Sequence, residues 1–552
     1  MIGSLRPFSL KEWEIRATYS TYLSGALPDL PTIARRLVEC DLAEAVYQPD
    51  GRCVYRDNAG AVRESRMALT VSADRSAATI SFEPSIEAEF AHEALIESGL
   101  FRYSELRLLP NGSPLVSDYL RAQIGAFVLA GPASRFHVRA TIKLHSNGVC
   151  ITEFRFASPD HDVDLATFVS SYVNSFSNNF DETLSPVGLA KLAPLAGETR
   201  KRVGFWERWR TVLLAKGHEQ AIDETKGDTE EGELAPLALR EEEGHETFDS
   251  LAETIALTVG YAISTPRSGW SYAILGQKQL ATPGYWVGRP HIYIISHSDQ
   301  ERDALKNERR HGKAFGWIMA RVAPTEDLDV RQYLPASLRK FADFGFYINK
   351  SISLCVHSTN SRERAEAFGP MGRAQLIFDC QVQAEVLDYV YMLTMKLSDR
   401  VSQPTARMID VVGAQAALVE AEAAASRTSR FGDVEELLQV AWERYGLPEL
   451  RDRISRTLET RRDEVALAES RSINRWGTGL ALVLGASVIP SLSHEVLPDL
   501  WRFFGWAVAE RAEVQRVVWL GISTGIVALL LLPISYLAQA PIRRLAKKAR
   551  SR

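Results

Sequence analysis

Two long stretches without a charged residue lie near the C-terminal end of the sequence. The first covers 476–493, and the second covers 517–542 with VALLLL at its centre. An α-helix rises about 1.5 Å per residue, so the first stretch is about 27 Å long and the second crosses the ~30 Å hydrocarbon core of a bilayer with margin. We therefore expect a transmembrane hairpin over 476–542. For the first stretch taken alone, a buried core helix is the alternative.

The charges around this hairpin predict its orientation. The connecting loop, 494–516, has three arginines and four acidic residues, whereas the tail, 543–552, has six basic residues and no acidic one. Cytoplasmic flanks of transmembrane helices carry an excess of Lys and Arg, so both termini are expected in the cytoplasm and the loop outside the cell inner membrane. The N-terminus has no apolar stretch of signal-peptide length, which also predicts a cytoplasmic location for 1–475.

Length and composition bound the rest of the chain. The 552 residues are enough for three or four units with cores of their own, and 46% apolar with 24% charged residues is typical of globular domains. The net charge of -5 argues against a nucleic-acid partner, since phosphate binding calls for a basic excess. The five cysteines are widely spaced without a CxxC pair, which favours reduced thiols over disulfides or a zinc site.

The range 1–190 is expected to form an N-terminal α/β domain. In FHVRATIKLHSNGVCITEFRF, apolar residues from Val138 to Leu144 alternate with polar ones, and Asn147-Gly148 follows. This pattern predicts a β-hairpin with a type I′ turn. RMALTVSAD and SAATISFEP predict a second strand pair.

The range 191–250 is expected to be an acidic linker or insertion. Between 216 and 249 there are twelve acidic residues and three lysines or arginines. Such a run is typical of a solvated segment, and a cation-collecting surface is the alternative.

A second α/β domain is predicted over 251–380. The segments HIYIISH, KAFGWIMARVA and FGFYINKSISLCVHS are rich in β-branched and aromatic residues, which indicates strands.

From 381 to 475 the apolar spacing changes to that of helices, ending in a stalk. One face of the first helix is apolar until Pro404, and an Ala-rich helix over about 405–427 and a third over 434–445 are expected to follow. The segment 449–476 has no Gly or Pro and an apolar stripe, so it is expected to run as a helix into the first membrane span. The apolar faces of the first helix and the stalk contain Val386, Val390, Leu393, Leu397 and Val401, and Leu450, Ile454, Leu458 and Val465.

The sequence has no motif that names an enzyme. It has no GxxxxGK[ST], GxSxG, HExxH or CxxC, so no catalytic residues are proposed and no cofactor is identified. The run Asp160-His161-Asp162-Val163-Asp164 offers cation ligands, or else a polar turn and helix N-cap. His291, His297 and His311 are either ligands or structural residues.

The layout of 251–552 resembles that of the CorA-type magnesium channels. In that family a mixed α/β cytoplasmic domain is followed by helices, a stalk entering the first span, a short outer loop, a second span and a basic tail. The resemblance implies a homo-oligomer, a pentamer as in the family, with the first span lining a pore and Mg²⁺ or another divalent cation as its cargo. The family's Gly-Met-Asn tripeptide is absent, because the corresponding stretch is Pro490-Ser491-Leu492-Ser493-His494-Glu495. CorA-like proteins without the tripeptide include membrane effectors gated by nucleotide-type ligands in prokaryotic antiviral systems.

Three functions follow as hypotheses: a cation channel or transporter gated by its cytoplasmic domains, a ligand-gated effector of antiviral defence, and a membrane-tethered enzyme or scaffold.

A face of small and polar residues on the first span, extended into the outer loop, could line a pore, because lipid cannot satisfy polar groups. Its alternative is helix packing with the loop carboxylates solvated. A GxxxG pair on the second span would allow close helix approach, or else consists of ordinary membrane glycines. The pore-lining candidates are Asn474, Thr478, Ala481, Gly485, Ser491, Glu495 and Asp499, and the helix-packing candidates are Gly521 and Gly525.

Overall fold

The computed structural model is a mixed α/β fold built on one large sheet. The residues it describes are 8–24, 27–48, 50–57, 59–71, 78–85, 94, 118–131, 135–175, 179–200, 234–237, 246–264, 287–324, 329–338, 343–367, 369–402, 408–409, 411–414, 416, 419, 439–467, 470–471, 474, 477 and 521. Residues 1–400 with 413–456 form one compact unit, and 401–412 with 457–552 form a second.

The strands that the structure describes form a single 14-stranded sheet. Its main path runs in the spatial order β13 (Phe344–Ile348), β14 (Ser353–His357), β12 (Val287–His297), β1 (Ser9–Tyr22), β8 (Val149–Ala157), β7 (Arg135–His145), β6 (Tyr119–Ala130), β2 (Ala45–Tyr47), β3 (Arg52–Arg56), β4 (Val62–Val71) and β5 (Ala78–Glu83). Off this path, β10 (Glu182–Pro186) joins β6 to β11 (Leu234–Pro236), and β9 (Val163–Asp164) pairs with β1. Among these pairs only β12–β14 is parallel.

The pairing of β1 with β12 joins strands from 1–190 and from 251–380 in this one sheet. Ten residue pairs connect the two strands, from Leu10 opposite His297 to Ser20 opposite Val287. The two ranges that the sequence assigns to separate α/β domains therefore share a continuous backbone ladder.

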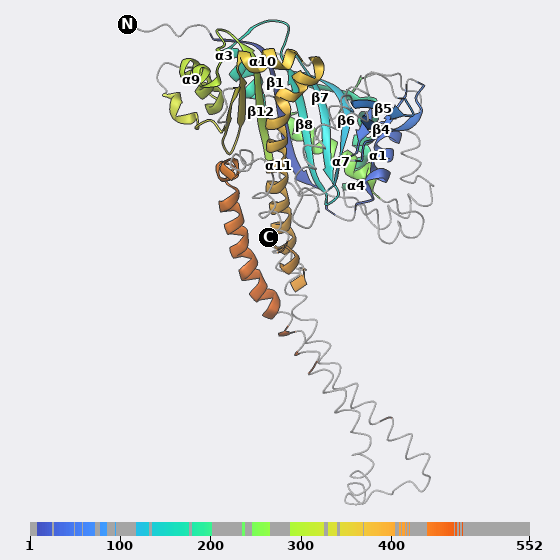
Figure 1. Ribbon diagram of the computed structural model, residues 1–552. Coiled ribbons are helices and arrows are strands. Elements are labelled where there is room, and N and C mark those ends of the chain that lie inside the picture. Colours follow the sequence, from blue (N-terminus) through green and yellow to red (C-terminus); the bar gives the residue numbers. More distant parts are fainter. Residues whose placement is uncertain are drawn as a thin grey trace, which may run out of the picture. The chain divides into compact units, whose positions relative to one another are not determined.

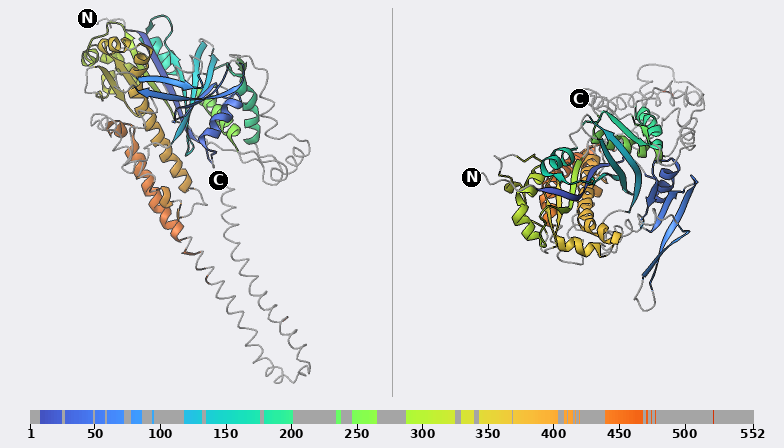
Figure 2. Two further views of the ribbon diagram at one scale, coloured as in Figure 1. Left: turned by 45° about the vertical axis from the view of Figure 1, so that its right-hand side comes forward. Right: turned by 90° about the horizontal axis from the view of Figure 1, so that it is seen from above.

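Helices lie on both faces of the sheet (Figure 1). In the second view of Figure 2, α9 and the strand pair β4–β5 lie at opposite ends of the sheet, as the strand order requires. A π-helical turn over Phe168–Val173 and a 3₁₀ turn over Val330–Tyr333 are also present. The labelled helices are α1 (Leu30–Glu39), α3 (Leu165–Thr167), α4 (Val187–Arg200), α7 (Phe248–Ile263), α9 (Ala304–Ala320), α10 (Thr359–Glu366) and α11 (Gly369–Ser402).

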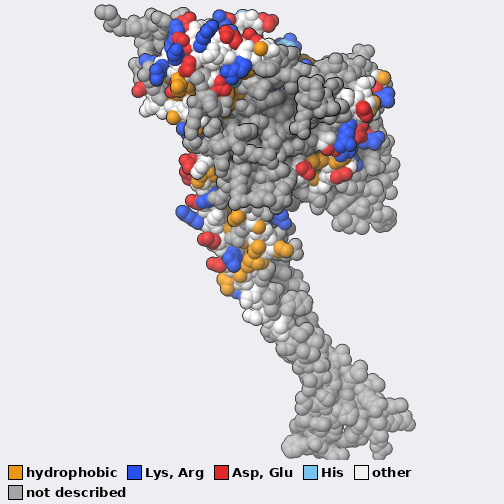
Figure 3. Space-filling view, viewed as in Figure 1, with side chains coloured by type: hydrophobic (Ala, Val, Ile, Leu, Met, Phe, Trp, Pro, Cys, Tyr) orange, Lys and Arg blue, Asp and Glu red, His pale blue; other side chains and the backbone are white. Residues whose placement is uncertain are grey.

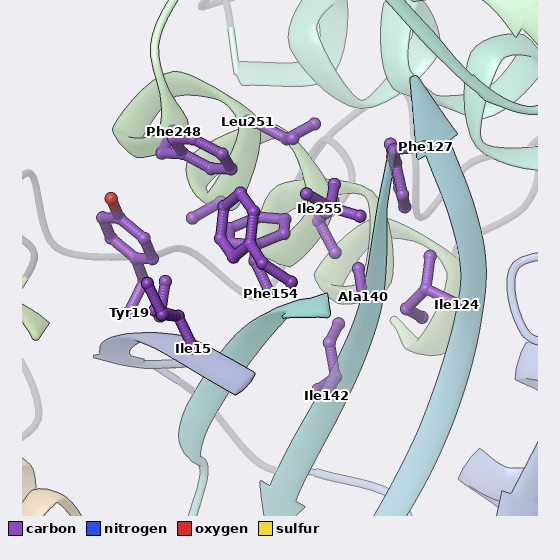
Figure 4. Packing of buried hydrophobic residues seen from close by; sticks show 14 of the residues in the cluster. Ile15, Tyr19, Ile124, Phe127, Ala140, Ile142, Phe154, Phe248, Leu251 and Ile255 are labelled. Carbon is purple, nitrogen blue, oxygen red and sulfur yellow. The ribbon is translucent and has the colours of Figure 1, made fainter. Parts of the chain in front are cut away.

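One face of the sheet is apolar and is covered by α7. Figure 4 shows Phe248, Leu251 and Ile255 of this helix on the side of the strands that carries Phe154 and Ile142. All five side chains are buried in the same hydrophobic cluster. Since successive residues of a strand point to opposite faces, the alternation seen in the sequence over 138–144 places its apolar half here.

The hairpin predicted around Asn147-Gly148 is confirmed as β7–β8, but its turn differs from type I′. Gly148 has the positive φ of 91°, whereas Asn147 is not among the residues with positive φ. The Gly148 amide donates to the His145 carbonyl at 2.7 Å, and the loop residues are 146–148. A three-residue loop with one left-handed glycine needs positive φ only at its last position. The pair β4–β5 is also confirmed.

The segment KAFGWIMARVA was expected to be a strand, and this expectation is wrong. It forms the C-terminal half of α9, which begins after Asp303 and ends at the left-handed Arg321. The Asp303 carboxylate accepts hydrogen bonds from the amides of Leu305 and Lys306 and so satisfies two of the free amides at the helix N-terminus. A short apolar run fits a buried helix as well as a strand. The predicted strands HIYIISH and FGFYINKSISLCVHS are confirmed as β12, β13 and β14.

The acidic range 191–250 contributes secondary structure at both ends. It contains most of α4, the short strand β11 and the start of α7, whose Thr247 and Ser250 form a capping box. Glu246 is also described, where it accepts a hydrogen bond from Thr183, and the acidic residues from 207 to 243 lie outside the described part of the chain.

The helical region predicted after 380 is confirmed in the described residues. The first helix begins earlier than expected, since α11 starts at Gly369. Residues 439–444 and 447–467 are helical, and the expected stripe residues Leu450, Ile454 and Leu458 are buried.

Among the described residues, no helix has the length and apolar character needed to cross a membrane. The expected spans 476–493 and 517–542 lie outside this part of the chain except for Gly477 and Gly521, both of which are helical. The transmembrane hairpin therefore stays a prediction.

We expect Gly148→Ala to destabilise the protein more than Gly60→Ala. Both glycines have positive φ, at 91° and 77°, but a Cβ at Gly148 would lie 2.6 Å from the Leu23 carbonyl oxygen, whereas one at Gly60 meets nothing within 4 Å. The strained backbone alone costs about 1 kcal/mol, and the overpacked contact adds about 1–3 kcal/mol. Urea unfolding of the purified full-length chain measures both losses. Equal losses would show that the Leu23 contact relaxes without cost.

Candidate functional site: the charged layer beneath α11

The face of the sheet opposite α7 is polar across its central strands. The register places Arg121 of β6 opposite Lys143 of β7, and Thr18 of β1 between Glu153 of β8 and Arg289 of β12. These side chains share one face because paired residues of neighbouring strands point the same way. Figure 1 shows α11 running along this face. The helix therefore covers a surface that carries several charges.

α11 presents a polar stripe to these strands. Gln381, Glu385, Asp388, Lys396 and Asp399 are separated by four, three, eight and three residues, and such spacings return to the same side of an α-helix. The first three are buried, and Lys396 and Asp399 are partly buried. Buried charges require partners, so these residues determine how α11 sits on the sheet.

Glu385 is the centre of the first ion cluster. Arg121 donates to both of its carboxylate oxygens at 2.8 Å, and the Lys143 ammonium donates to Oε2 at 2.8 Å. Gln381, one turn earlier, donates to Oε1 at 2.8 Å. Burial acts to raise the pKa of Glu385, but the charges of Arg121 and Lys143 outweigh it and hold the pKa well below its usual range. Glu385 is therefore ionised at neutral pH.

Asp388 is the centre of the second cluster, which lies one turn further along α11. It accepts from Thr18 Oγ1 at 2.8 Å and from Arg289 Nη1 at 2.6 Å, and the Tyr445 hydroxyl donates to Oδ1. His291 Nε2 lies 3.3 Å from Oδ2. Burial acts to raise the pKa of Asp388, while the hydrogen bond with His291 and the charge of Arg289 lower it, to about 2.

Arg289 connects α11 to two other segments, at Lys350 and Tyr445. Its Nε donates to the Lys350 carbonyl at 3.0 Å, and its guanidinium lies 3.8 Å from the centroid of the Tyr445 ring and 4.7 Å from that of Tyr391. Arginine stacked on aromatic rings gains a cation–π attraction that is stronger when water is excluded. Tyr445 belongs to the turn after the helix 439–444, so the cluster also fixes that segment.

The C-terminal half of α11 contacts the β7–β8 hairpin and the end of β1. Tyr22 donates to Asp399 at 2.6 Å, Asn147 donates to the Tyr389 hydroxyl at 2.9 Å, and Lys396 donates to the Asn147 carbonyl. Burial lowers the pKa of Lys396 to about 8, and the charge of Arg400 acts in the same direction.

Ser353, His291 and Asp388 are hydrogen-bonded in the order of a hydrolase triad. Ser353 Oγ lies 2.7 Å from His291 Nδ1, and His291 Nε2 faces Asp388. Their exposed fractions are 3%, 2% and 0%, so no substrate reaches the serine. A nucleophile must meet its substrate, and this arrangement therefore pairs polar groups within the fold.

Most of the site residues proposed from the sequence lie outside the described residues. Asn474 and Gly521 are described, and both are helical and exposed. They belong to the second compact unit, whereas the charged layer belongs to the first. The others remain predictions: Thr478, Ala481, Gly485, Ser491, Glu495, Asp499 and Gly525.

The Asp160–Asp164 run is a turn and a helix cap. Asp164 accepts hydrogen bonds from the amides of Ala166 and Thr167 at the start of α3, and Asp162 accepts one from Ser9. Among the residues that the structure describes, no group of three or more His, Cys, Asp and Glu could hold a metal ion. The hydrogen bonds therefore support the interpretation of this run as a polar turn and helix N-cap.

Of the three histidines considered as ligands, His291 is separate from the other two. His291 belongs to the Asp388 cluster, whereas the rings of His297 and His311 lie 5.0 Å apart beside Phe8. Burial lowers the pKa of His297 to about 4 and also lowers that of His311.

Glu385 and Asp388 are the central residues that the sequence did not reveal as a site. Their signal was two acidic residues within AEVLDYVYML, a stretch otherwise apolar enough to be buried. Buried acids imply basic partners elsewhere, but the sequence does not say which strands provide them.

We expect Glu385→Gln to reduce the free energy of unfolding by about 3–5 kcal/mol, because it leaves Arg121 and Lys143 buried without their carboxylate. The exposed pair Arg35–Glu39 provides a control, since Glu39→Gln should change stability by less than about 1 kcal/mol. Urea unfolding at pH 7 measures both. A loss for Glu385→Gln no larger than for the control would contradict the role given to this cluster.

The same carboxylates predict how stability depends on pH. The pKa values of Glu385 and Asp388 are lower in the folded than in the unfolded chain, where carboxyl groups titrate near pH 4. Their stabilisation is therefore complete above about pH 5 and is lost as the pH falls through 4 toward 2. Unfolding free energies measured from pH 7 to pH 3 should decrease for the wild type and decrease less steeply for Asp388→Asn. Parallel pH profiles would refute this assignment.

Comparisons with protein-family models, with curated proteins and with solved structures found no match to this chain. Its function is therefore inferred from the charged layer and from the sequence beyond it.

Proposed function

We propose that this chain is an oligomeric inner-membrane protein of CorA-like layout, in which a cytoplasmic α/β domain controls cation passage through a bundle of transmembrane hairpins. The observation that carries the proposal is the pair of uncharged stretches, 476–493 and 517–542, between an acidic loop and a basic tail. A single two-helix hairpin cannot enclose a water path, so several subunits must surround one. Five subunits would match the CorA-type arrangement.

The charged layer supports the regulatory half of the proposal. A gated protein needs an element that can adopt two arrangements. A helix held by discrete ion clusters has one arrangement with these contacts made and another with them broken. The layer fixes both α11 and the segment of Tyr445, which precedes the helix 447–467 in the chain. A ligand that competes for the charges beneath α11 would change the contacts of both segments. This mode of regulation would apply both to a channel with a regulatory ligand and to an effector of antiviral defence.

The acidic loop supports the conducting half. In an oligomer, Glu495 and Asp499 would each form a ring of carboxylates at the outer end of the path, which attracts cations and repels anions. Thr478, Ala481 and Gly485 would line the path itself, and Gly521 with Gly525 would allow close helix packing. The cargo class is a cation, with Mg²⁺ as the candidate that the layout suggests.

The topology gives the first test. Cysteine introduced at Ser493 should react with an impermeant thiol reagent in intact cells, because this position is placed at the outer end of the first span. Cysteine introduced at Ser551 should react only after the cells are opened, since the tail is placed inside. The five native cysteines are buried in the structure and need not be removed. The reverse labelling pattern would exclude this orientation.

Conductance gives the second test. The full-length protein in lipid vesicles should pass cations, with or without a protein-free cell extract that supplies a ligand. Glu495→Lys with Asp499→Lys should reduce the cation flux several-fold, because the rings would then repel cations. Glu510→Lys, in the same loop but outside the rings, is the control and should leave the flux unchanged. A wild-type protein that conducts nothing in either condition would make the hairpin a plain anchor and refute the channel.

A further inference from the structure

Three arginines form a row across the polar face of the sheet. Arg16 of β1 is opposite Arg155 of β8, which in turn is opposite Arg139 of β7. Neighbouring strands lie about 4.8 Å apart, and like charges directly opposite one another destabilise a sheet. The row therefore needs negative charge close by.

Two glutamates compensate one end of the row. Glu14 lies 2.6 Å from Arg16 and 3.0 Å from Arg155, and Glu153 lies 3.2 Å from Arg16. The side chains of Glu14 and Glu153 are only 7% and 8% exposed. At the other end, no carboxylate of the described residues forms an ion pair with Arg139.

The end of the row at Arg139 is open to solvent. Along β7 the polar-face residues Arg135, His137 and Arg139 are exposed, whereas Lys143 further along is buried. Arg155 is 43% exposed, and the residue opposite Arg139 on β6 is the small Ala126. On the described strands, the acidic side chain in register with Arg135 is Glu182 of β10, two strands away across Ala130. Figure 3 shows blue and red side chains interspersed near α10, where charges of both signs are exposed.

We propose that Arg135, His137, Arg139 and Arg155 form a binding site for an oligophosphate, a compound with two or more linked phosphate groups. Guanidinium groups bind phosphate oxygens in pairs, and two such groups on adjacent strands suit two linked phosphates better than one. His137 and Arg135 extend the basic surface along β7 at about 7 Å intervals, which suits a chain of phosphates. The existence of this site is independent of the membrane hairpin, and only its role as the gating site rests on the proposed function.

The site is placed to act on the charged layer. Phosphate oxygens at Arg155 would compete with Glu14, which also holds Arg16. Arg16 is opposite His291, and His291 contacts Asp388 of α11. A row of adjacent polar and charged residues thus leads from the exposed arginines to the helix.

Equilibrium binding of pyrophosphate and of inorganic phosphate to the purified full-length chain tests the proposal. Pyrophosphate should bind more tightly than inorganic phosphate, and Arg139→Gln should weaken its binding about ten-fold or more, as expected for one lost charge-assisted contact. Arg139→Lys keeps the charge but loses the planar fork and should weaken binding less. Arg309→Gln, which removes an exposed arginine on α9, is the matched control and should bind as the wild type does.

Phosphate groups could come from a soluble compound or from a lipid headgroup, and the same assay in bilayer discs separates them. If phosphoinositide in the discs lowers pyrophosphate affinity relative to phosphatidylcholine alone, the site accepts headgroups, and if it does not, the ligand is soluble. Arg139 is exposed, so its variants should retain the wild-type unfolding midpoint. Equal affinities of Arg139→Gln and Arg309→Gln, or no pyrophosphate binding by the wild type, would overturn the site while leaving the conductance test unaffected.

Discussion

The compensation of buried positive charge by two carboxylates of α11 is the constraint on which the rest of the domain depends. Arg121, Lys143 and Arg289 project from central strands into a buried layer, where an unpaired charge costs several kcal/mol. Glu385 and Asp388 lie within one turn and reach all three. A rotation of the helix by one residue position would turn both acids away together. The charges therefore fix the rotation and the axial position of α11 far more narrowly than an apolar contact would.

The two faces of the sheet consequently play different parts. The apolar face under α7 contributes most of the hydrophobic burial, and such cores tolerate replacement by side chains of similar volume. The polar face contributes less net stability, because desolvation offsets much of the attraction between its charges. Besides the apolar packing of α11 residues such as Leu387 and Val390, it provides a small number of specific contacts that a competing ion can exchange. That property suits a domain proposed to respond to a ligand, and the apolar face gives it a rigid base.

Local features of the sequence predicted a good part of this structure. The alternation over Val138–Leu144, the Gly148 turn and the helical spacing after Cys380 each depend on neighbouring residues, and each indicated the correct element. The α9 segment failed, because an apolar run of this length fits either a helix or a strand. The charged layer could not be predicted, since Glu385 meets Arg121 and Lys143 from positions 264 and 242 residues away in the chain. Only the pairing of β6 with β7 and the docking of α11 bring them together.

The position of β1 in the middle of the sheet affects the order in which the chain can fold. One edge of β1 pairs with β8, but its other edge waits for β12, which ends at His297. At a synthesis rate of about 5–20 residues per second, the segment between Tyr22 and His297 takes about 15–55 s to emerge. Throughout that time an N-terminal strand of 14 residues presents an unpaired edge, the kind of surface on which chains aggregate. The sheet therefore cannot be completed around β1 until the chain has been synthesised as far as β12.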